Sequence, residues 1–177
     1  MTHREAVERF LASKRIALVG VSRNPKDFSR AVFTALVKAG YEVVPVNPGV
    51  EELEGRRCFA RLSGVAPPVE AALLMVASAQ AEEVTRDAID AGVKQVWFHR
   101  GVGPGAASPA ALELCAKAGV AVVDELCPFM VLQPPTGWAH RLHGWFRLRS
   151  LARNDARALP PGPGLGSLSP DSGRGRG

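Results

Sequence analysis

The feature that most constrains the fold is an alternation of short apolar runs with segments of helical spacing. The apolar runs are six or seven residues long and rich in Val, Ile and Leu, as buried strands are. Strands that alternate with helices predict right-handed βαβ units and a parallel sheet. The five candidate strands cover residues 15–21, 41–46, 71–77, 94–99 and 120–125.

Three of the intervening segments carry helix signals. Residues 28–39 have apolar side chains at helical spacing and stop at Gly40, a favourable residue just after a helix. Residues 81–91 are also followed by a glycine, and a third helix is expected to begin after the N-cap residue Ser108. Helices on both faces of the sheet would explain why the strands are apolar throughout.

The chain is therefore expected to hold one α/β domain and a different kind of tail. A single Rossmann-like, doubly wound parallel sheet with helices on both faces is predicted over residues 10–132. Residues 133–159 form a basic, aromatic extension with a loosely amphipathic, helix-like spacing. Residues 160–177 are rich in Pro, Gly and Ser, and we expect them to be disordered.

The net charge of +5 lies entirely in the tail. Residues 1–137 hold 15 Lys/Arg and 15 Asp/Glu, whereas residues 138–177 hold seven Arg and two Asp, and 7 − 2 = +5. Any attraction to polyanions therefore belongs to the tail. The tail could lie on an anionic membrane, touch RNA, or pack on the body or a second subunit. Packing is the favoured interpretation, and no specific nucleic acid is predicted.

Two features of the sequence indicate the cellular compartment in which the protein is expected. No apolar run approaches the roughly 20 residues needed to cross a bilayer, and the charged start lacks the pattern of a secretory signal. The three cysteines, Cys58, Cys115 and Cys127, are an odd number without Cys-x-x-Cys spacing. A cytoplasmic protein with reduced thiols is expected.

The turn after the first candidate strand is the strongest functional signal. Gly20 allows a sharp bend or a close approach of backbone to ligand, and Ser22 can donate to a phosphate oxygen. Arg23 and Lys26 add positive charge, and a helix N-terminus with free N–H groups is expected next. This combination suits a phosphorylated ligand, while a surface turn with two solvated cations remains the alternative.

The dinucleotide fingerprint is not met. Ser22 and Pro25 stand where Gly-x-Gly-x-x-Gly would place glycines, and the second candidate strand ends at Asn47 rather than at an acidic residue. A carboxylate at that position would bind the adenosine ribose of NAD. An NAD(P)-dependent enzyme of divergent type therefore stays only as an alternative.

Four motifs together resemble a known family. GVSRNP, GYEVVPVNP, GVKQVWFHRGV and VVDELCP resemble the small CoA-binding proteins, single Rossmann-like domains similar to the N-terminal CoA-binding domain of the succinyl-CoA synthetase α subunit. The resemblance covers residues 10–132. One departure is His99, where members of the family commonly have Gln.

The resemblance implies that CoA or an acyl-CoA is held at the carboxyl ends of the parallel strands. The expected contacts to the phosphates and the adenosine end are Gly20, Ser22, Arg23 and Lys26. The other contacts that it implies are Val46, Asn47 and Pro48 beside the adenine or ribose, and Ala77 and Ser78 beside the pantetheine arm. His99 and Cys127 follow later strands and are expected near the same edge, where His99 could contact the ligand or be a structural histidine.

Cys127 has two interpretations. Its thiol could meet the CoA thiol as a redox contact or mixed disulfide, or it could be a partly buried structural cysteine. The carboxylates of Asp124 and Glu125 nearby disfavour a thiolate. His140 and His143 have a spacing that can bind a metal, but no third ligand is evident, and no metal is predicted.

No catalytic arrangement is evident in the sequence, so a carrier, sensor or regulatory module is expected. The alternatives are the NAD(P)-dependent enzyme, the CoA-binding half of an acyl-CoA ligase that needs a partner subunit, and a nucleic-acid or membrane module that acts through the tail. The sequence also leaves the oligomeric state undecided, and a homodimer is one alternative.

Overall fold

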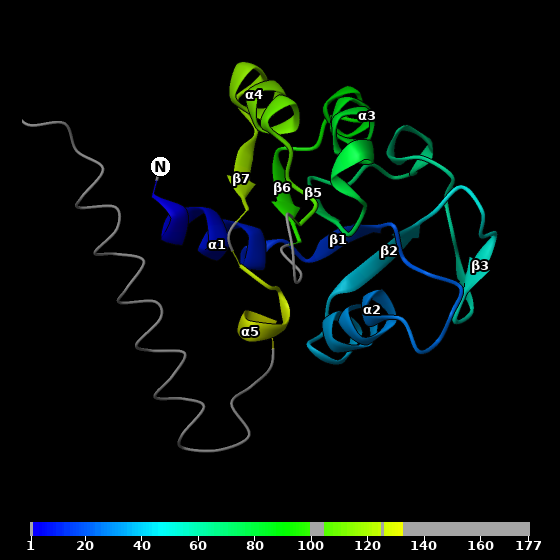
Figure 1. The fold of residues 1–177 in the computed structure, drawn as a ribbon. Coiled ribbons are helices and arrows are strands. Elements are labelled where there is room, and N and C mark those ends of the chain that lie inside the picture. The colour runs from blue at the N-terminus through cyan, green and yellow to red at the C-terminus, as the bar shows by residue number, and fades with distance from the viewer. Residues whose placement is uncertain (1, 100–104, 125, 133–177) are drawn as a thin grey trace, which may run out of the picture.

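Five parallel strands form the main sheet of this protein, shown in Figure 1. The structure is a computed structural model that describes residues 2–99, 105–124 and 126–132, so the predicted extension and tail lie outside the described residues. The strands, in their order across the sheet, are β2 (Glu42–Val46), β1 (Arg15–Val19), β5 (Ala71–Leu74), β6 (Gln95–Phe98) and β7 (Ala121–Val123).

The strand order fixes where a ligand can approach. Val19, at the end of β1, is paired with Val46 of β2 on one side and with Leu74 of β5 on the other. After β1 the chain adds β2 on one side of it. The later strands β5, β6 and β7 are then added in sequence on the other side of β1. The gap between β1 and β5 is therefore the topological switch point, beside which open α/β sheets bind ligands.

Helices cover both faces of the sheet, which confirms the predicted α/β, Rossmann-like architecture (Figure 1). The cluster of buried residues on one face includes side chains of α1 and α2, and the cluster on the other face includes those of α3 and α4. A short helix, α5, follows β7 and contacts α2. The helices are α1 (His3–Ala12), α2 (Phe28–Lys38), α3 (Ser78–Asp90), α4 (Pro109–Ala118) and α5 (Phe129–Leu132).

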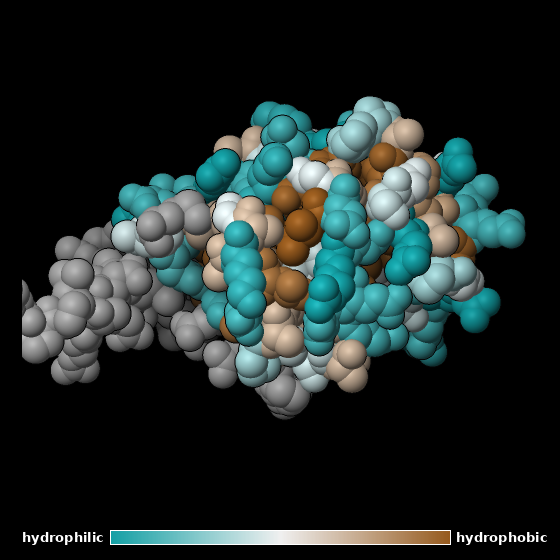
Figure 2. Space-filling model, turned by 90° about the horizontal axis from the view of Figure 1, so that it is seen from above, coloured by the Kyte–Doolittle hydropathy of each residue, from teal (hydrophilic) through white to brown (hydrophobic). Residues whose placement is uncertain are grey.

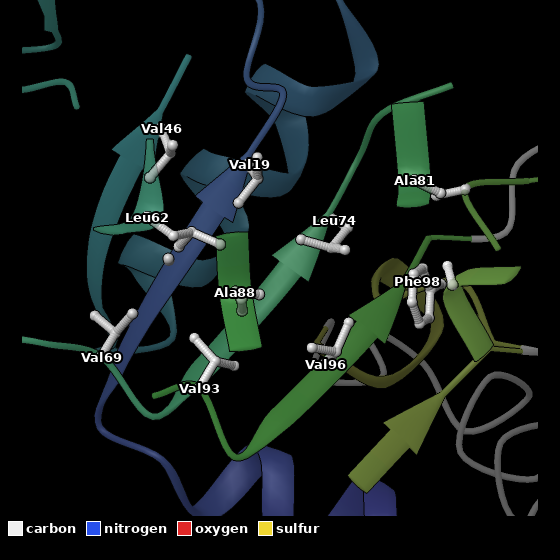
Figure 3. Packing of buried hydrophobic residues seen from close by; sticks show 14 of the residues in the cluster. Val19, Val46, Leu62, Val69, Leu74, Ala81, Ala88, Val93, Val96 and Phe98 are labelled. Atoms are coloured by element: carbon white, nitrogen blue, oxygen red, sulfur yellow. The ribbon is translucent and has the colours of Figure 1, made fainter. Parts of the chain in front are cut away.

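Two hydrophobic cores result, one on each face. Ile16 and Leu18 of β1 contribute to the core beneath α1 and α2, whereas Ala17 and Val19 contribute to the core beneath α3 and α4. Figure 3 shows the second core, where Val19 and its neighbours on adjacent strands point toward α3. Because both faces are buried, the strands of the main sheet are apolar at nearly every position. The exceptions are the first residues of β1, β2 and β6, which are Arg15, Glu42 and Gln95.

Helix α1 was not predicted. Its N-cap Thr2 accepts a hydrogen bond from the Glu5 backbone N–H at 3.3 Å, and the Glu5 carboxylate accepts one from the Thr2 N–H at 2.8 Å. This capping box satisfies two backbone N–H groups at the start of the helix, those of Thr2 and Glu5. The helix buries Phe10 against Trp97, whose ring centroid is 5.2 Å away.

Residues 51–59 contain a hairpin that is separate from the main sheet. Strands β3 (Glu52–Leu53) and β4 (Arg56–Arg57) pair antiparallel and are not part of the main sheet. The two residues between them, Glu54 and Gly55, have φ angles of 50° and 73°. Positive φ at both central positions is what a type I′ hairpin turn requires.

The surface of the described part is mixed in character. Figure 2 shows the face over α3 and α4, where hydrophobic residues lie between rows of hydrophilic ones. Among the described residues, Phe28 is the large hydrophobic side chain that is exposed, at 45%. None of the helices in this part of the chain has the length and apolar character that a bilayer span requires.

Candidate functional site

The segments that follow the five strands meet at one edge of the sheet, because all five strands are parallel. Gly20 follows β1, Asn47 follows β2, Met75 follows β5, His99 follows β6, and the segment leading to Cys127 follows β7. This carboxyl edge includes the switch point, and it carries most of the residues singled out from the sequence.

Gly20 makes the closest backbone approach at this edge. Its φ is 86°, in the left-handed region, and a Cβ added there would lie 2.5 Å from the carbonyl oxygen of Met75. Its N–H donates to the carbonyl of Val46 at 2.9 Å. The turn after β1 is therefore held between the ends of β2 and β5, in a position that only glycine can occupy without strain.

The loop that follows is ordered by its own hydrogen bonds. Ser22 donates its N–H to Ser29 Oγ at 2.9 Å, and its hydroxyl accepts from the Asn24 N–H at 3.1 Å. The hydroxyl proton of Ser22 remains available for a ligand oxygen. Arg23 and Lys26 are exposed, and neither forms an ion pair with a residue in the described ranges.

The predicted free N–H groups at the start of α2 are only partly present. The N-cap Asp27 accepts from the Ser29 N–H at 2.8 Å and from the Ser29 hydroxyl at 2.6 Å, and its carbonyl accepts from the Arg30 N–H at 3.1 Å. The prediction is wrong for the amides of Ser29 and Arg30, because the aspartate at the N-cap satisfies these two donors itself. The hydrogen bonds from Ser29 also hold the pKa of the Asp27 carboxyl below its usual value.

Replacing this cap should lower stability in a pH-dependent way. We expect Asp27→Ala to reduce the free energy of unfolding at pH 7 by about 0.5–2 kcal/mol. Because the pKa of Asp27 is lower in the folded state, its stabilisation is present above the unfolded pKa, near 3.8, and is lost as the pH falls through the folded value. Urea unfolding at pH 7 and at about pH 3 should show the difference between variant and wild type shrinking in acid.

Asp90→Ala is the matched control, because Asp90 is exposed at the last residue of α3 and caps no helix N-terminus. At pH 7, Asp90→Ala should lower the free energy of unfolding less than Asp27→Ala does. Equal losses in the two variants would contradict the capping role.

Helix α3 begins differently. Its N-cap is Ala77, and no side chain in the described residues caps its first turn. Ala77 is exposed and Ser78 is half-buried. Alanine is a poor cap, so the first amides of this 13-residue helix keep unsatisfied donors beside the switch point, where an anion can bind.

Asn47 joins the loops after β1 and β2. Its Nδ2 donates to the Val21 carbonyl at 2.8 Å, and its Oδ1 accepts from the Gly49 N–H at 2.8 Å. Val46 is buried and Pro48 is exposed. The side-chain amide of Asn47 thus already has protein partners, and the expected ligand contacts of Val46, Asn47 and Pro48 stay predictions.

A second group of side chains gathers at the ends of β6 and β7. The Cys127 Sγ lies 3.9 Å from His99 Nε2, and both residues are partly buried. The Phe28 ring is 5.2 Å from the His99 ring and 5.5 Å from the Phe129 ring, measured between centroids. Burial lowers the pKa of the His99 imidazole, which favours its neutral form. The sequence marks His99 and Cys127 as separate candidates, but no sequence signal indicates their contact.

Cys58 and Cys115 are both buried. Burial raises the pKa of Cys58 and raises that of Cys115 to about 11, so both thiols are poor nucleophiles. His140 and His143 lie outside the described residues.

One cation near the switch point was not anticipated. Arg30 Nη2 lies 2.5 Å from Glu54 Oε1, and Arg30 Nη1 lies 3.5 Å from the Ser22 carbonyl oxygen. The pair connects α2 with the β3–β4 turn across 24 positions of the chain. No local sequence signal could have indicated it, because the pairing depends on how the hairpin folds back.

The fold and the carboxyl edge of the sheet together define the class of protein. It is a doubly wound α/β domain with a Gly-x-Ser turn at the switch point and without the dinucleotide fingerprint. Comparison with known families then identifies it. The CoA binding domain family matches residues 14–133, and the chain belongs to this family. The resemblance stated from the four motifs is confirmed.

Known relatives are similar over most of the same region. An uncharacterized protein, YneT, of Bacillus subtilis is 29% identical over 123 residues, covering 70% of this chain and 88% of the relative. The structure of a hypothetical protein from Pyrococcus horikoshii has a TM-score of 0.66 at 31% identity, and the match covers 72% of this chain and 87% of that one.

A larger protein contains a similar part. The dinucleotide-forming acetyl-coenzyme A synthetase 1 of Ca. Korarchaeum cryptofilum has a TM-score of 0.58 at 29% identity. The match covers 66% of this chain but only 27% of the synthetase.

Proposed function

We propose that this protein binds CoA or an acyl-CoA along the carboxyl edge of its sheet and acts as a carrier, sensor or regulatory module. The observation that carries the proposal is the turn at Gly20, which lies against the Met75 carbonyl at the switch point and exposes Arg23 and Lys26 beside it. The membership of the chain in the CoA binding domain family supports this choice of ligand.

The charges available suit a phosphorylated ligand bound with modest electrostatic help. Residues 20–27 carry two cations, Arg23 and Lys26, and one anion, Asp27, so their net charge is 2 − 1 = +1. The uncapped amides of α3 add neutral donors for a phosphate. Backbone donors and shape must therefore supply much of the affinity, because each exposed charge contact contributes only about 0.3–1 kcal/mol.

Calorimetric titration of the full chain with CoA, NAD and NADP tests the proposal. We expect selective binding of CoA. The double variant Arg23→Gln/Lys26→Gln should bind CoA about 3- to 30-fold more weakly, since two such contacts together contribute roughly 0.6–2 kcal/mol. The difference from wild type should diminish at high salt, because exposed charges are screened.

Lys38→Gln/Lys94→Gln is the control, with the same change in net charge. Lys38 is exposed at the last turn of α2, and Lys94 is exposed just before β6, so both lie at the opposite edge of the sheet. If this control weakens CoA binding as much as the Arg23/Lys26 variant, the ligand is not at the Gly20 turn. Absence of CoA binding at millimolar ligand would refute the proposal, and binding of NAD or NADP alone would favour the divergent enzyme.

A second candidate function is the CoA-binding part of a ligase formed from separate subunits. The similarity to about a quarter of an acetyl-coenzyme A synthetase favours it. Stable copurification with a larger ATP-binding subunit, and CoA ligation only in that complex, would support it. CoA binding without any such partner would favour the module acting alone.

A further inference from the structure

The Cys127 thiol and the His99 imidazole, at the ends of β7 and β6, are not among the phosphate contacts of the proposed function, yet they lie on the same edge of the sheet. Cys127 Sγ is 3.9 Å from His99 Nε2, within reach for transfer of the thiol proton. Hydrogen bonds of the backbone hold both residues in place. His99 donates its N–H to Leu74 and accepts from Ala106, and the Leu126 carbonyl beside Cys127 accepts from the Trp97 indole at 2.8 Å.

The pair lies where the thiol end of a bound CoA would come. From the end of β1, where Gly20 lies, the ends of β6 and β7 are two and three strand spacings away, about 10–14 Å. The pantetheine arm has a backbone about as long as four extended residues, roughly 14 Å. With the phosphates at the Gly20 turn, as in the proposed function on which this step rests, an arm laid along the edge ends beside Cys127 and His99.

The surroundings of the pair favour an apolar group over a bare thiol. Phe28 is 45% exposed, although large apolar side chains are usually buried, and its ring lies 5.2 Å from the His99 ring. Phe129 extends this apolar wall at 5.5 Å from Phe28. Two aromatic rings beside a nucleophile are suited to packing the acyl group of a thioester ligand.

We propose that Cys127 accepts the acyl group of a bound acyl-CoA, with His99 as its general base and Phe28 and Phe129 as the wall for the acyl group. The neutral imidazole takes the thiol proton as Cys127 Sγ adds to the thioester carbonyl. The carbon–sulfur bond to CoA breaks, and the departing CoA thiolate receives that proton from the imidazolium. The products are S-acyl-Cys127 and free CoA; one thioester replaces another, so no oxidant or further reactant is needed.

The burial of the other cysteines favours Cys127 as the nucleophile. Cys58 and Cys115 are buried, and burial raises the pKa of each, so neither competes as a nucleophile.

Intact-protein mass spectrometry of the full chain incubated with acetyl-CoA or butanoyl-CoA tests the step. We expect one acyl group per chain, released by hydroxylamine and mapped by peptide analysis to Cys127. Cys127→Ser should yield no thioester, and His99→Gln should slow acylation by about 10²-fold or more. Phe28→Ala should slow transfer of the butanoyl group more than that of the acetyl group.

Cys115→Ala is the control cysteine variant and should acylate like wild type, because Cys115 is in the core beneath α4. Calorimetry with CoA on the same preparation separates the two ideas. CoA binding without acylation overturns the acyl-transfer step and leaves the proposed function standing. A mass gain of a whole CoA that reductant removes overturns the acyl-transfer step in favour of an oxidatively formed mixed disulfide between Cys127 and CoA. Absence of CoA binding overturns both the acyl-transfer step and the proposed function.

Discussion

Gly20→Ala is expected to reduce the free energy of unfolding by about 2–5 kcal/mol. Two costs combine: a side chain at φ 86° is strained, and its Cβ would lie 2.5 Å from the Met75 carbonyl oxygen. That oxygen belongs to the backbone at the end of β5, so relief requires the ends of two paired strands to separate. Urea unfolding followed by circular dichroism measures the loss.

Gly40→Ala separates the two costs. Gly40 has a φ of 88°, nearly the same as Gly20, but a Cβ there would meet nothing within 4 Å. We expect Gly40→Ala to lower the free energy of unfolding by only about 1–2 kcal/mol, which is the cost of a side chain in the left-handed conformation. If both variants lose the same stability, the close approach of Gly20 to Met75 is not present in solution.

The same variant bears on binding. Movement of the β1 and β5 ends would displace the Ser22 loop and the start of α3, which are the donors assigned to the ligand phosphates. Gly20→Ala should therefore lose CoA affinity even at temperatures where it is folded. Unchanged affinity in the folded variant would remove the Gly20 turn from the proposed site.

Trp97→Phe is expected to cost about 2–4 kcal/mol of unfolding free energy. Trp97 is 1% exposed, its indole N–H donates to the Leu126 carbonyl at 2.8 Å, and Phe10 meets its ring edge-on at 5.2 Å. Phenylalanine leaves a cavity and an unsatisfied buried carbonyl. Because Leu126 precedes Cys127, the variant should also react faster at Cys127 with a thiol reagent.

Tyr41→Phe is the control for the lost hydrogen bond. The Tyr41 hydroxyl also donates to a backbone carbonyl, that of Leu11, at 2.9 Å, but from a half-buried position. Water can replace this donor, so we expect a loss of only about 0.5–1.5 kcal/mol. A Trp97→Phe loss no larger than this would indicate that the indole does not hold the β7–α5 segment in place.

Some of the structure that sequence analysis left out was signalled locally. Thr2 and Glu5 have the spacing of a capping box, which indicates the start of α1. Asp27 stands immediately before the first residue of α2, where an aspartate caps a helix. These signals indicate the first helix and the occupied amides of the second. Both depend on residues within one helical turn of each other.

By itself, the sequence determined the alternation of strands and helices, the α/β class, and the glycine turn after the first strand. These follow from hydrophobic periodicity, β-branched composition and the conformational freedom of glycine, all properties of neighbouring residues. The motifs also determined the family, which the comparisons confirm.

Only the tertiary structure decided which of these residues meet. The strand order brings Gly20 against Met75 and places His99 beside Cys127, 28 positions further along the chain. It also brings Phe28, at the start of α2, against the His99 ring. Such contacts arise from the pairing of distant strands and the docking of helices on their faces. Periodicity within a segment does not specify these pairings, because it records which face is buried but not what covers it.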